Sequence, residues 1–232
     1  LRTLAGAFAI ALSLPAAAQD KMQLQLNWFH LADHSPIYLA LKKGYYKEEN
    51  IDLTVLRGSG SADAAKKVDL GQADVGIADA PTVLTAISKG ANLKMVAVVY
   101  DKAGNNVFFR KSANIKTPKD LVGKKIAVPP ADSHRVLWPA FAAINGIDPA
   151  SVTLVNIKPE GKQAIVAAGE VDGSFDLYTS YAIWEKVLGK GEVANLLWAD
   201  FGLPIYGHTY FVNNDLLQKN PKLVERFLRA TH

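Results

Sequence analysis

Segments with the period of a β-strand alternate along the chain with segments that have helical spacing. Gln23–Leu26 alternates polar and apolar residues, and Ser35–Lys43 then takes up helical spacing with Pro36 in its first turn. The same alternation continues through Ile51–Leu56, Ala62–Leu70, Ala73–Ala78, Pro81–Ser88 and Leu93–Tyr100. Strands joined through helices form right-handed crossovers, which place the strands side by side in one sheet. The sequence therefore predicts an α/β fold with a mainly parallel sheet.

The pattern restarts in the middle of the chain, which indicates a second sheet with its own helices. The expected elements are Asn106–Arg110, Thr117–Leu121, Gly123–Val128, Ser133–Asn145, Val152–Ile157, Gln163–Ala168, Gly173–Leu177 and Ser180–Val187. Tyr210–Asn213 then predicts a strand that crosses back to the first sheet. We expect one lobe to comprise residues 19–103 with 206–232, and the other to comprise 104–205. Two chain crossings between lobes form a hinge that permits closure.

The N-terminal segment has the composition of a secretory signal. Leu4–Leu14 is almost wholly apolar, and small residues follow as far as Ala18. Because about 20 apolar residues are needed to span a bilayer, this run is too short for a membrane anchor. We expect a signal peptide at 1–18, cleaved near Ala18, and a periplasmic mature protein. At the other end, Phe227–Ala230 lies within a helical pattern, and we expect the C-terminal part of the first lobe to be incomplete.

The amino-acid composition excludes several classes of function. The chain has no cysteine, which excludes disulfides, thiolate zinc sites, a cysteine nucleophile and a lipid-anchoring cysteine. The formal net charge is only +4, and the charges are scattered without a basic stripe that carries aromatics. Nucleic acid is therefore not an expected partner.

In parallel α/β sheets, ligands bind beyond the carboxyl ends of the strands, so the loops there supply the candidate residues. The candidate ligand-binding residues are Trp28, His34, Ser59, Gly60, Ser61, Asp79, Pro81, Tyr100, Ser133, His134, Phe175, Asp176, Tyr178 and Tyr206. Trp28 suits either core packing or stacking against a ligand ring. Ser59, Gly60 and Ser61 precede the predicted helix Ala62–Leu70. Their backbone N–H groups could bind an anion, or Ser61 could be an ordinary helix N-cap, and both interpretations stay open. A Gly-x-Ser-x-Gly elbow is absent from the sequence, so hydrolase chemistry has no support.

Several motifs spread over the chain resemble one known family. They are Leu26–Trp28, His34–Ala40, Lys43–Glu48, Ala73–Gly76, Gly123–Ile126, Gly169–Asp172 and Asn214–Leu216, with Pro221, Val224, Phe227 and Leu228. Together they resemble the family that unites thiamine-pyrimidine synthases with periplasmic pyrimidine-precursor and sulfonate-binding proteins. The resemblance implies a two-lobed type II periplasmic binding protein fold. It also places His34 by the ligand pocket as a hydrogen-bonding residue, in preference to a metal site with His30 and Asp33.

The family that the chain resembles also includes enzymes, the thiamine-pyrimidine synthases. In the synthases, a lysine that binds pyridoxal phosphate and a histidine that is consumed lie where this chain has Ala78 and Thr82. A cysteine-rich iron segment is expected near Pro204–Tyr210, and this chain has no cysteine there. Neither alanine nor threonine supplies the amine or the imidazole that this chemistry needs. We therefore expect no catalytic residues, no cofactor and no metal.

The expected function is capture of a small organic molecule and its delivery, by a monomer, to a membrane-embedded ABC permease with its ATPase. The candidate loops hold carboxylates at Asp33, Asp63, Asp79, Asp101, Asp132 and Asp176, against Arg57 and Arg135 as the nearest cations. Because arginine forks are the usual anion ligands, this balance favours a flat nitrogen heterocycle such as a pyrimidine. Sulfonate, nitrate or aromatic carboxylate is the alternative ligand. An extracellular sensor and a synthase-like or prephenate-dehydratase-like enzyme are the alternative classes.

Overall fold

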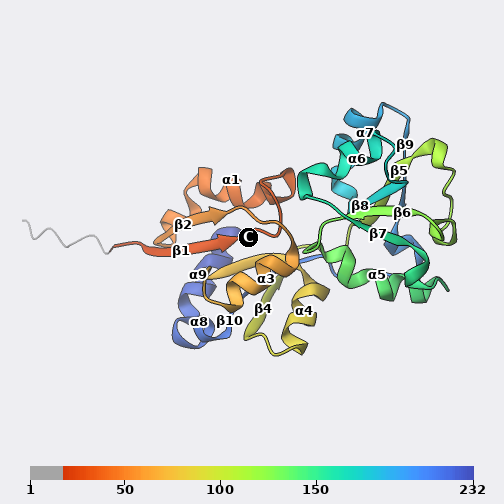
Figure 1. The fold of residues 1–232 in the computed structure, drawn as a ribbon. Coiled ribbons are helices and arrows are strands. Elements are labelled where there is room, and N and C mark those ends of the chain that lie inside the picture. Colours follow the sequence, from red (N-terminus) through yellow and green to blue (C-terminus); the bar gives the residue numbers. More distant parts are fainter. Residues whose placement is uncertain (1–17) are drawn as a thin grey trace, which may run out of the picture.

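The computed structural model describes residues 18–232, which form two α/β lobes side by side (Figure 1). The predicted signal peptide lies outside the described residues, apart from Ala18. The sheet of the first lobe has the order β2-β1-β3-β10-β4. Its strands are β1 (Asp20–Gln25), β2 (Ile51–Leu56), β3 (Val75–Asp79), β4 (Leu93–Val98) and β10 (His208–Asn213).

The sheet of the second lobe repeats this topology, with the order β7-β6-β8-β5-β9. Its strands are β5 (Asn105–Arg110), β6 (Lys125–Val128), β7 (Thr153–Asn156), β8 (Gly173–Leu177) and β9 (Val193–Leu197). The prediction of a mainly parallel sheet needs one correction. Each strand that follows a crossing between the lobes is antiparallel to both of its neighbours: β10 to β3 and β4, and β5 to β8 and β9. A chain that enters from the other lobe arrives from the opposite end of the sheet, which reverses its direction.

Helices cover both faces of each sheet. The first lobe carries α1 (Ser35–Lys43), α2 (Tyr45–Glu48), α3 (Ser61–Asp69), α4 (Ala80–Ser88), α8 (Asn214–Lys219) and α9 (Pro221–Thr231). The second lobe carries α5 (Ser133–Ile144), α6 (Lys162–Ala167) and α7 (Tyr181–Leu188). Short 3-10 helices lie at Ala32–His34, Lys111–Ala113, Pro118–Leu121, Pro149–Ser151, Pro159–Gly161, Tyr178–Ser180 and Trp198–Phe201. Among the described residues, no helix is both long enough and apolar enough to cross a membrane.

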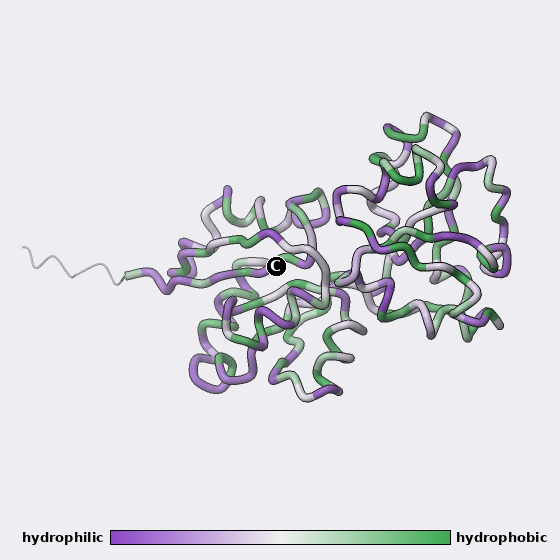
Figure 2. Tube along the Cα trace, viewed as in Figure 1, coloured by the Kyte–Doolittle hydropathy of each residue, from purple (hydrophilic) through white to green (hydrophobic). Residues whose placement is uncertain are grey.

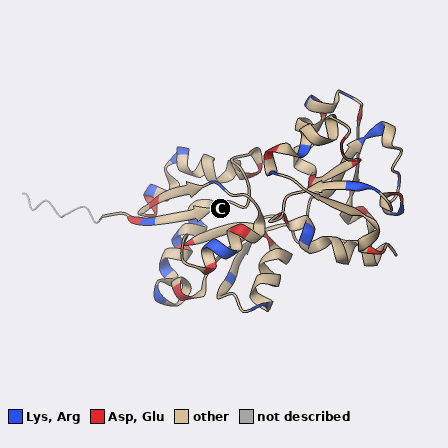
Figure 3. Ribbon diagram, in the orientation of Figure 1, with Lys and Arg blue, Asp and Glu red and all other residues tan. Residues whose placement is uncertain are grey.

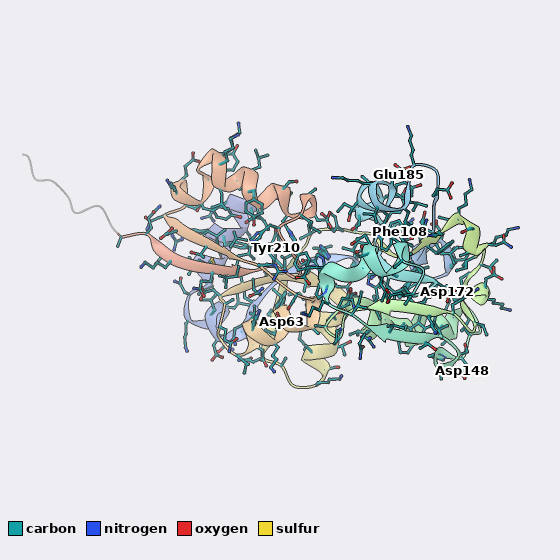
Figure 4. The ribbon with its side chains drawn as sticks, turned by 45° about the horizontal axis from the view of Figure 1, so that its top comes forward. Asp63, Phe108, Asp148, Asp172, Glu185 and Tyr210 are labelled. Atoms are coloured by element: carbon teal, nitrogen blue, oxygen red, sulfur yellow. The ribbon has the colours of Figure 1, made fainter. Side chains whose placement is uncertain are left out.

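Each lobe has its own core, because alternate strand residues meet helices on opposite faces of the sheet. In the first lobe, Tyr210 packs edge-on against Phe227 of α9, with ring centroids 5.5 Å apart, while its neighbour Phe211 joins the cluster of α3 and α4. In the second lobe, Phe108 stacks on Trp184 of α7, with centroids 5.1 Å apart. Figure 2 shows apolar stretches along the strands of both lobes, and Figure 4 shows Tyr210 and Phe108 within different lobes.

Two crossing segments, 99–104 and 203–207, form the hinge. They are hydrogen-bonded to each other: the Ala103 amide donates to the Ile205 carbonyl over 2.8 Å, and the Gly207 amide donates to the Tyr100 carbonyl over 2.9 Å. Paired backbone segments bend together, so the lobes are joined by one ribbon rather than by two independent linkers. This arrangement suits a hinge motion that opens and closes the space between the lobes.

Candidate functional site

A cavity lined mainly by polar side chains lies between the lobes, beyond the carboxyl ends of the strands; we call it the polar cavity. The first lobe contributes Asn27, Trp28, Leu31, Asp33, His34, Gly60, Ser61 and His208. The second lobe contributes Asp132, Ser133, His134, Lys162, Asp176, Leu177 and Ser180. Its volume is about 30 Å³, which is room for a water molecule but not for an organic ring. A larger occupant therefore requires the lobes to separate or side chains to rotate.

A second, larger cavity of about 210 Å³ lies next to the hinge, and we call it the hinge cavity. Its lining residues are Asp33, Asp79, Tyr100, Lys102, Ala103, Gly104, Leu177, Tyr178, Thr179, Leu197, Gly207 and His208. Because Asp33, Leu177 and His208 line both cavities, the two spaces adjoin. The hinge cavity exceeds the ~150 Å³ of an engineered cavity that binds benzene, so it has room for one aromatic ring.

A buried charge network forms the second-lobe wall of the polar cavity. The Lys162 ammonium donates to Asp132 Oδ2 over 2.7 Å and to Asp176 Oδ1 over 3.4 Å, and His134 Nδ1 donates to Asp132 Oδ1 over 2.6 Å. Burial opposes charge on Asp132, but Lys162 and His134 outweigh it, so the pKa of Asp132 lies below its usual value. Burial likewise opposes charge on Lys162, yet the two carboxylates hold its pKa above the usual value. Lys162 is therefore a fixed cation at neutral pH.

Lys162 also links the lobes. Its ammonium lies 4.5 Å from the centre of the Trp28 ring, in cation–π range, while Trp28 stacks on Phe29 with centroids 5.2 Å apart. A ligand ring that stacks on this face of Trp28 has to displace the Lys162 head group. The hinge cavity offers a ring a place that needs no such displacement.

The first-lobe wall carries two histidines joined by one amide. Asn27, just beyond β1, accepts from His34 Nε2 over 2.9 Å and donates to His208 Nε2 over 3.1 Å. Burial lowers the pKa of His34 to about 4 and that of His208 to about 3. Both imidazoles are therefore neutral at physiological pH.

Asp79 ends β3 and caps α4 at the edge of the hinge cavity. Its carboxylate accepts from the Thr82 amide over 3.4 Å and from the Thr82 hydroxyl over 3.2 Å, while its own amide donates to Ser61 Oγ over 3.2 Å. Burial raises its pKa to about 6, although the Thr82 hydrogen bonds and the nearby His134 oppose the shift. Asp79 therefore changes charge between pH 5 and 7.

Contacts between the lobes surround the two cavities. The Thr179 hydroxyl donates to Asp33 Oδ2 over 2.9 Å, and burial raises the pKa of Asp33. The Ala62 amide donates to the Ala131 carbonyl over 3.3 Å. Gly60 lies so close to Ala131 that a Cβ at this position would come within 2.2 Å of the same carbonyl oxygen. The interface at this point is thus tight enough to require glycine.

The structure gathers most of the sequence-predicted site residues around the two cavities. The polar cavity receives Trp28, His34, Gly60, Ser61, Ser133, His134 and Asp176. The hinge cavity receives Asp79, Tyr100 and Tyr178. Ser59, Pro81, Phe175 and Tyr206 line neither of them. Whether any of these residues binds a ligand stays a prediction.

Local packing explains the four residues outside the cavities. Phe175 is fully buried and packs against His134 and Trp198, with centroids 5.6 and 5.0 Å away. Ser59 donates to Asp63 over 3.1 Å within its own turn. Pro81 and the exposed Tyr206 line a separate surface depression, together with Asp101 and Ile205 of the hinge segments.

Three residues that line the polar cavity, Lys162, Asn27 and His208, were not among the sequence-predicted site residues. The helix predicted at Gln163–Ala168 begins one residue after Lys162, and the only cations considered near the candidate loops were Arg57 and Arg135. Asn27 follows a predicted strand directly, which is the signal that could have identified it. His208 lies at the start of the strand that returns from the second lobe, and its neighbours come from a segment 181 residues earlier.

The site offers little support for a metal or for pyridoxal phosphate. Within residues 18–232, no group of three or more metal-ligating side chains is placed to hold a metal ion. His30 and His34 have separate partners, because His30 contacts the Tyr38 hydroxyl and His34 contacts Asn27. At the positions where the sequence resemblance placed the synthase lysine and histidine, Ala78 is buried in β3 and Thr82 contacts Asp79. The amine of Lys162 is held protonated, so it does not suit imine formation with a cofactor.

The chain shares its fold with solute-binding components of import systems. It aligns with the alkanesulfonate-binding protein SsuA from Xanthomonas axonopodis pv. citri, bound to MOPS, with a TM-score of 0.75 and 18% identity, over 92% of this chain and 73% of that chain. It aligns with the periplasmic nitrate-binding protein NrtA from Synechocystis PCC 6803 with a TM-score of 0.69 and 16% identity, over 92% and 60% of the two chains. With two such sheets, a paired hinge and a cavity between the lobes, this is a periplasmic binding protein fold, as the sequence predicted.

Sequence comparison identifies the family. The model of the NMT1/THI5-like family matches residues 31–232, so the chain belongs to that family. It is 26% identical over 217 residues to the 4-amino-5-hydroxymethyl-2-methylpyrimidine phosphate synthase of Legionella pneumophila, covering 93% of this chain and 68% of the relative. It is 24% identical over 217 residues to the formylaminopyrimidine-binding protein of Halalkalibacterium halodurans, covering 92% and 64%. The chain thus spans about two thirds of the length of these curated relatives.

Proposed function

We propose that this protein is a solute-binding protein that captures a small organic molecule between its lobes and delivers it to an ABC permease with its ATPase. The observation that carries the proposal is the pair of adjoining cavities, lined by buried polar side chains from both lobes and bordered by a paired hinge. Lobes that contact the same ligand close around it, because the ligand binds the closed form more tightly than the open one.

The favoured ligand is a flat nitrogen heterocycle that carries an amine. In the polar cavity, the carboxylates of Asp132 and Asp176 face a single ammonium, that of Lys162, which disfavours an anion. The hinge cavity has room for a ring beside Tyr100 and Tyr178, and Asp33 lies at the junction of the two cavities. A ring gains about 0.5–1.5 kcal/mol from each well-placed aromatic partner beyond its burial.

A thermal-shift panel tests the ligand class. Aminopyrimidines, aromatic carboxylates, alkanesulfonates and nitrate are each added at the same series of concentrations. A ligand at 100 times its dissociation constant stabilises the folded state by about 2.7 kcal/mol, which gives a clear shift. Stabilisation by aminopyrimidines, reduced in Tyr178→Ala, supports the proposal. Stabilisation by alkanesulfonate or nitrate alone contradicts the heterocycle preference and favours the alternative ligands.

We further propose that the protein is not an enzyme. The support is chemical: Ala78 and Thr82 cannot replace a lysine and a histidine, and Lys162 is paired with two carboxylates. The name of the Legionella relative makes synthesis of a pyrimidine the activity to test against. Incubation with pyridoxal phosphate and iron should leave the cofactor spectrum unchanged and yield no pyrimidine. Formation of product contradicts the proposal.

Export belongs to the same proposal, with a signal peptide at 1–18 and a periplasmic mature protein. The support is the apolar segment Leu4–Leu14 and the small residues that end at Ala18. Mass spectrometry of protein from a periplasmic extract should give a mature chain that begins at Gln19. Permease and ATPase genes beside the coding sequence would favour import over a sensor role.

A further inference from the structure

The carboxyl group of Asp79 is buried at the boundary between the lobes, where it lines the hinge cavity and is only 1% exposed. Across this cavity the second lobe presents only uncharged residues, which are Gly104, Leu177, Tyr178, Thr179 and Leu197. Lys102 of the hinge lines the same cavity, but its ammonium pairs with Asp200 over 3.8 Å, and both of these side chains are exposed. When the lobes meet, Asp79 is therefore covered by a wall that offers no partner for a negative charge.

The hydrogen bonds of Asp79 leave one carboxyl oxygen available for a proton. The amide and the hydroxyl of Thr82 both donate to Oδ1, over 3.4 and 3.2 Å. Among the described residues no donor reaches Oδ2, which keeps contact with the hinge cavity. A proton on Oδ2 therefore removes the charge and leaves the cap of α4 in place.

Other titratable groups surround Asp79 from both lobes and from the hinge. The first lobe and the hinge supply Asp33, His34, Tyr100, Lys102 and His208, and the second lobe supplies Asp132, His134, Lys162, Asp176 and Tyr178. Lys162 is paired with two carboxylates of its own lobe. The Asn106 amide donates to His134 Nε2 over 3.3 Å, which favours a neutral ring with its proton on Nδ1. Neither side chain thus supplies Asp79 with an unpaired positive charge.

Closure of the lobes changes how much water reaches this carboxyl. With the lobes apart, the second-lobe wall of the hinge cavity is removed, and water stabilises the carboxylate. With the lobes together, burial raises the pKa of Asp79 to about 6, and repulsion by Asp132 of the other lobe adds to the rise. A group that binds protons more tightly in the closed form makes protons favour that form, because the two equilibria are linked.

We propose that closure of the lobes is coupled to the uptake of a proton by Asp79, so that the closed form holds an uncharged carboxyl and the open form a carboxylate. The proton moves between solvent and Oδ2, and this coupling favours closure as the pH falls from 8 to 5. His34 and His208 act with the opposite sign, because burial lowers their pKa values. The inference rests on the closure that the proposed function requires, and its tests use protein without ligand.

The first test measures the distance between the lobes with two spin labels. The sequence has no cysteine, so Lys43→Cys on α1 and Lys186→Cys on α7 place one label on each lobe (Figure 1), at exposed positions. Pulsed electron spin resonance then gives the ratio of closed to open molecules at pH 8 and at pH 5. Proteins that differ only at Asp79 are compared, which cancels the contribution of the two histidines.

Asp79→Asn is uncharged at every pH, so its closed-to-open ratio should exceed that of the protein with Asp79. Because Asp79 itself takes up a proton on acidification, this excess should shrink by about 3- to 10-fold from pH 8 to pH 5. Asp52→Asn is the matched control: it removes an exposed carboxyl of the same lobe, outside both cavities, and should leave the ratio unchanged.

An excess that is equal at the two pH values, or no excess at either, overturns the proposal. A single distance that neither pH nor Asp79→Asn alters overturns it as well. A compound that stabilises the protein in the thermal-shift panel would in each case still support the binding function, so failure of the proton coupling is distinguishable from failure of the proposed function.

The second test follows the carboxyl group itself by ¹³C nuclear magnetic resonance, with Asp79→Asn to identify its signal. In the unaltered protein we expect a pKa of about 6 for Asp79. Gly60→Ala hinders closure, because its Cβ would meet the Ala131 carbonyl of the other lobe, and should weaken proton binding at Asp79 by about 3-fold or more. Ala62→Gly is the control that should keep the value of the unaltered protein. Equal proton binding in Gly60→Ala and the unaltered protein would overturn the coupling, and if Gly60→Ala fails to fold, the spin-label comparison decides.

Discussion

At the scale of single residues, Asp79 is a buried carboxyl whose environment favours its protonated form. Burial raises its pKa from 3.8 to about 6. Between these two values the folded state binds more protons than the unfolded state, so this residue lowers stability as pH rises through that window. Asparagine is uncharged at every pH and still caps a helix. Asp79→Asn should therefore raise the free energy of unfolding at pH 8 by roughly 1–3 kcal/mol and leave it unchanged near pH 3. Urea unfolding at the two pH values measures the difference, and equal effects at both would contradict it.

His34 and His208 act with the opposite sign. Burial lowers their pKa values from 6.5 to about 4 and about 3, so the unfolded state binds more protons than the folded state below pH 6.5. Stability should fall as pH drops from 6.5 toward 4, by up to about 1.4 kcal/mol per pH unit for each ring. Urea unfolding at four pH values from 4.5 to 7.5 measures the slope. The Asp79→Asn variant removes the opposing effect of that carboxyl. In this variant, the further change His208→Gln should lower the slope of unfolding free energy against pH by up to about 1.4 kcal/mol per pH unit, which corresponds to one proton. An unchanged slope would contradict the burial of a neutral His208.

At the scale of elements, the pairing of β3 with β10 depends on a glycine. Gly76 lies opposite Phe211 in the antiparallel register, and a Cβ on Gly76 would come within 2.3 Å of the Phe211 ring. Gly76→Ala should therefore destabilise the protein by about 1–3 kcal/mol through overpacking. Phe211→Leu makes room, so the double variant should be at least 1 kcal/mol more stable than the sum of the single effects predicts. Gly161→Ala is the control, since nothing lies within 4 Å of its added Cβ. Additive effects at Gly76 and Phe211 would argue against the close contact.

Elements with strong periodicity were predicted well from the sequence. The expected bounds of Ser35–Lys43, Ile51–Leu56 and Gly173–Leu177 agree with α1, β2 and β8. The strand Val193–Leu197 was not predicted, because it is a short edge strand without alternation of polar and apolar residues and pairs only with β5. The four-residue helix α2 was also missed, since one helical turn has no period to detect.

The cavity residues show where sequence reasoning stops. Loops after strands could be identified as site segments, because the carboxyl edge of a sheet follows from the strand order. The burial of Lys162 could not be identified, because it depends on an ion pair with Asp132, 30 residues earlier, that only tertiary packing creates. The bridge from Asn27 to His208 joins residues 181 positions apart through the returning strand β10. Phe175 illustrates the converse: it belongs to a strand, and its side chain points into the core of the second lobe.

At the scale of the whole molecule, the lobes meet through the Lys162–Trp28 cation–π contact, the close approach of Gly60 to Ala131, and a small number of exposed polar contacts. Charged side chains are scattered over both lobes (Figure 3), and the buried group of Asp132, Lys162 and Asp176 lies at the cavity between them. The Arg57–Glu160 ion pair joins the lobes over 2.6 Å, but both side chains are more than half exposed, so it contributes at most about 1 kcal/mol. The Asp33–Thr179 and Ala62–Ala131 hydrogen bonds add polar contacts at the same boundary. Exposed contacts of this kind contribute little to stability, so under the proposed function we expect bound ligand to be the main determinant of closure.

Closure should therefore depend on ligand, and small-angle X-ray scattering measures it directly. A ligand shifts the population only through its differential affinity for the closed form. With the compound that gives the largest thermal shift at saturation, the radius of gyration should fall relative to the ligand-free protein.

Arg57→Ala should weaken binding less than about 5-fold, since an exposed ion pair contributes little. Gly60→Ala should prevent full compaction, because its Cβ would meet the Ala131 carbonyl across the interface. Ala62→Gly, which adds no atom there, is the control that should still close. A scattering profile unchanged by saturating ligand in the unaltered protein would show that the lobes do not move, and would place ligand entry in side-chain rotation around the hinge cavity instead.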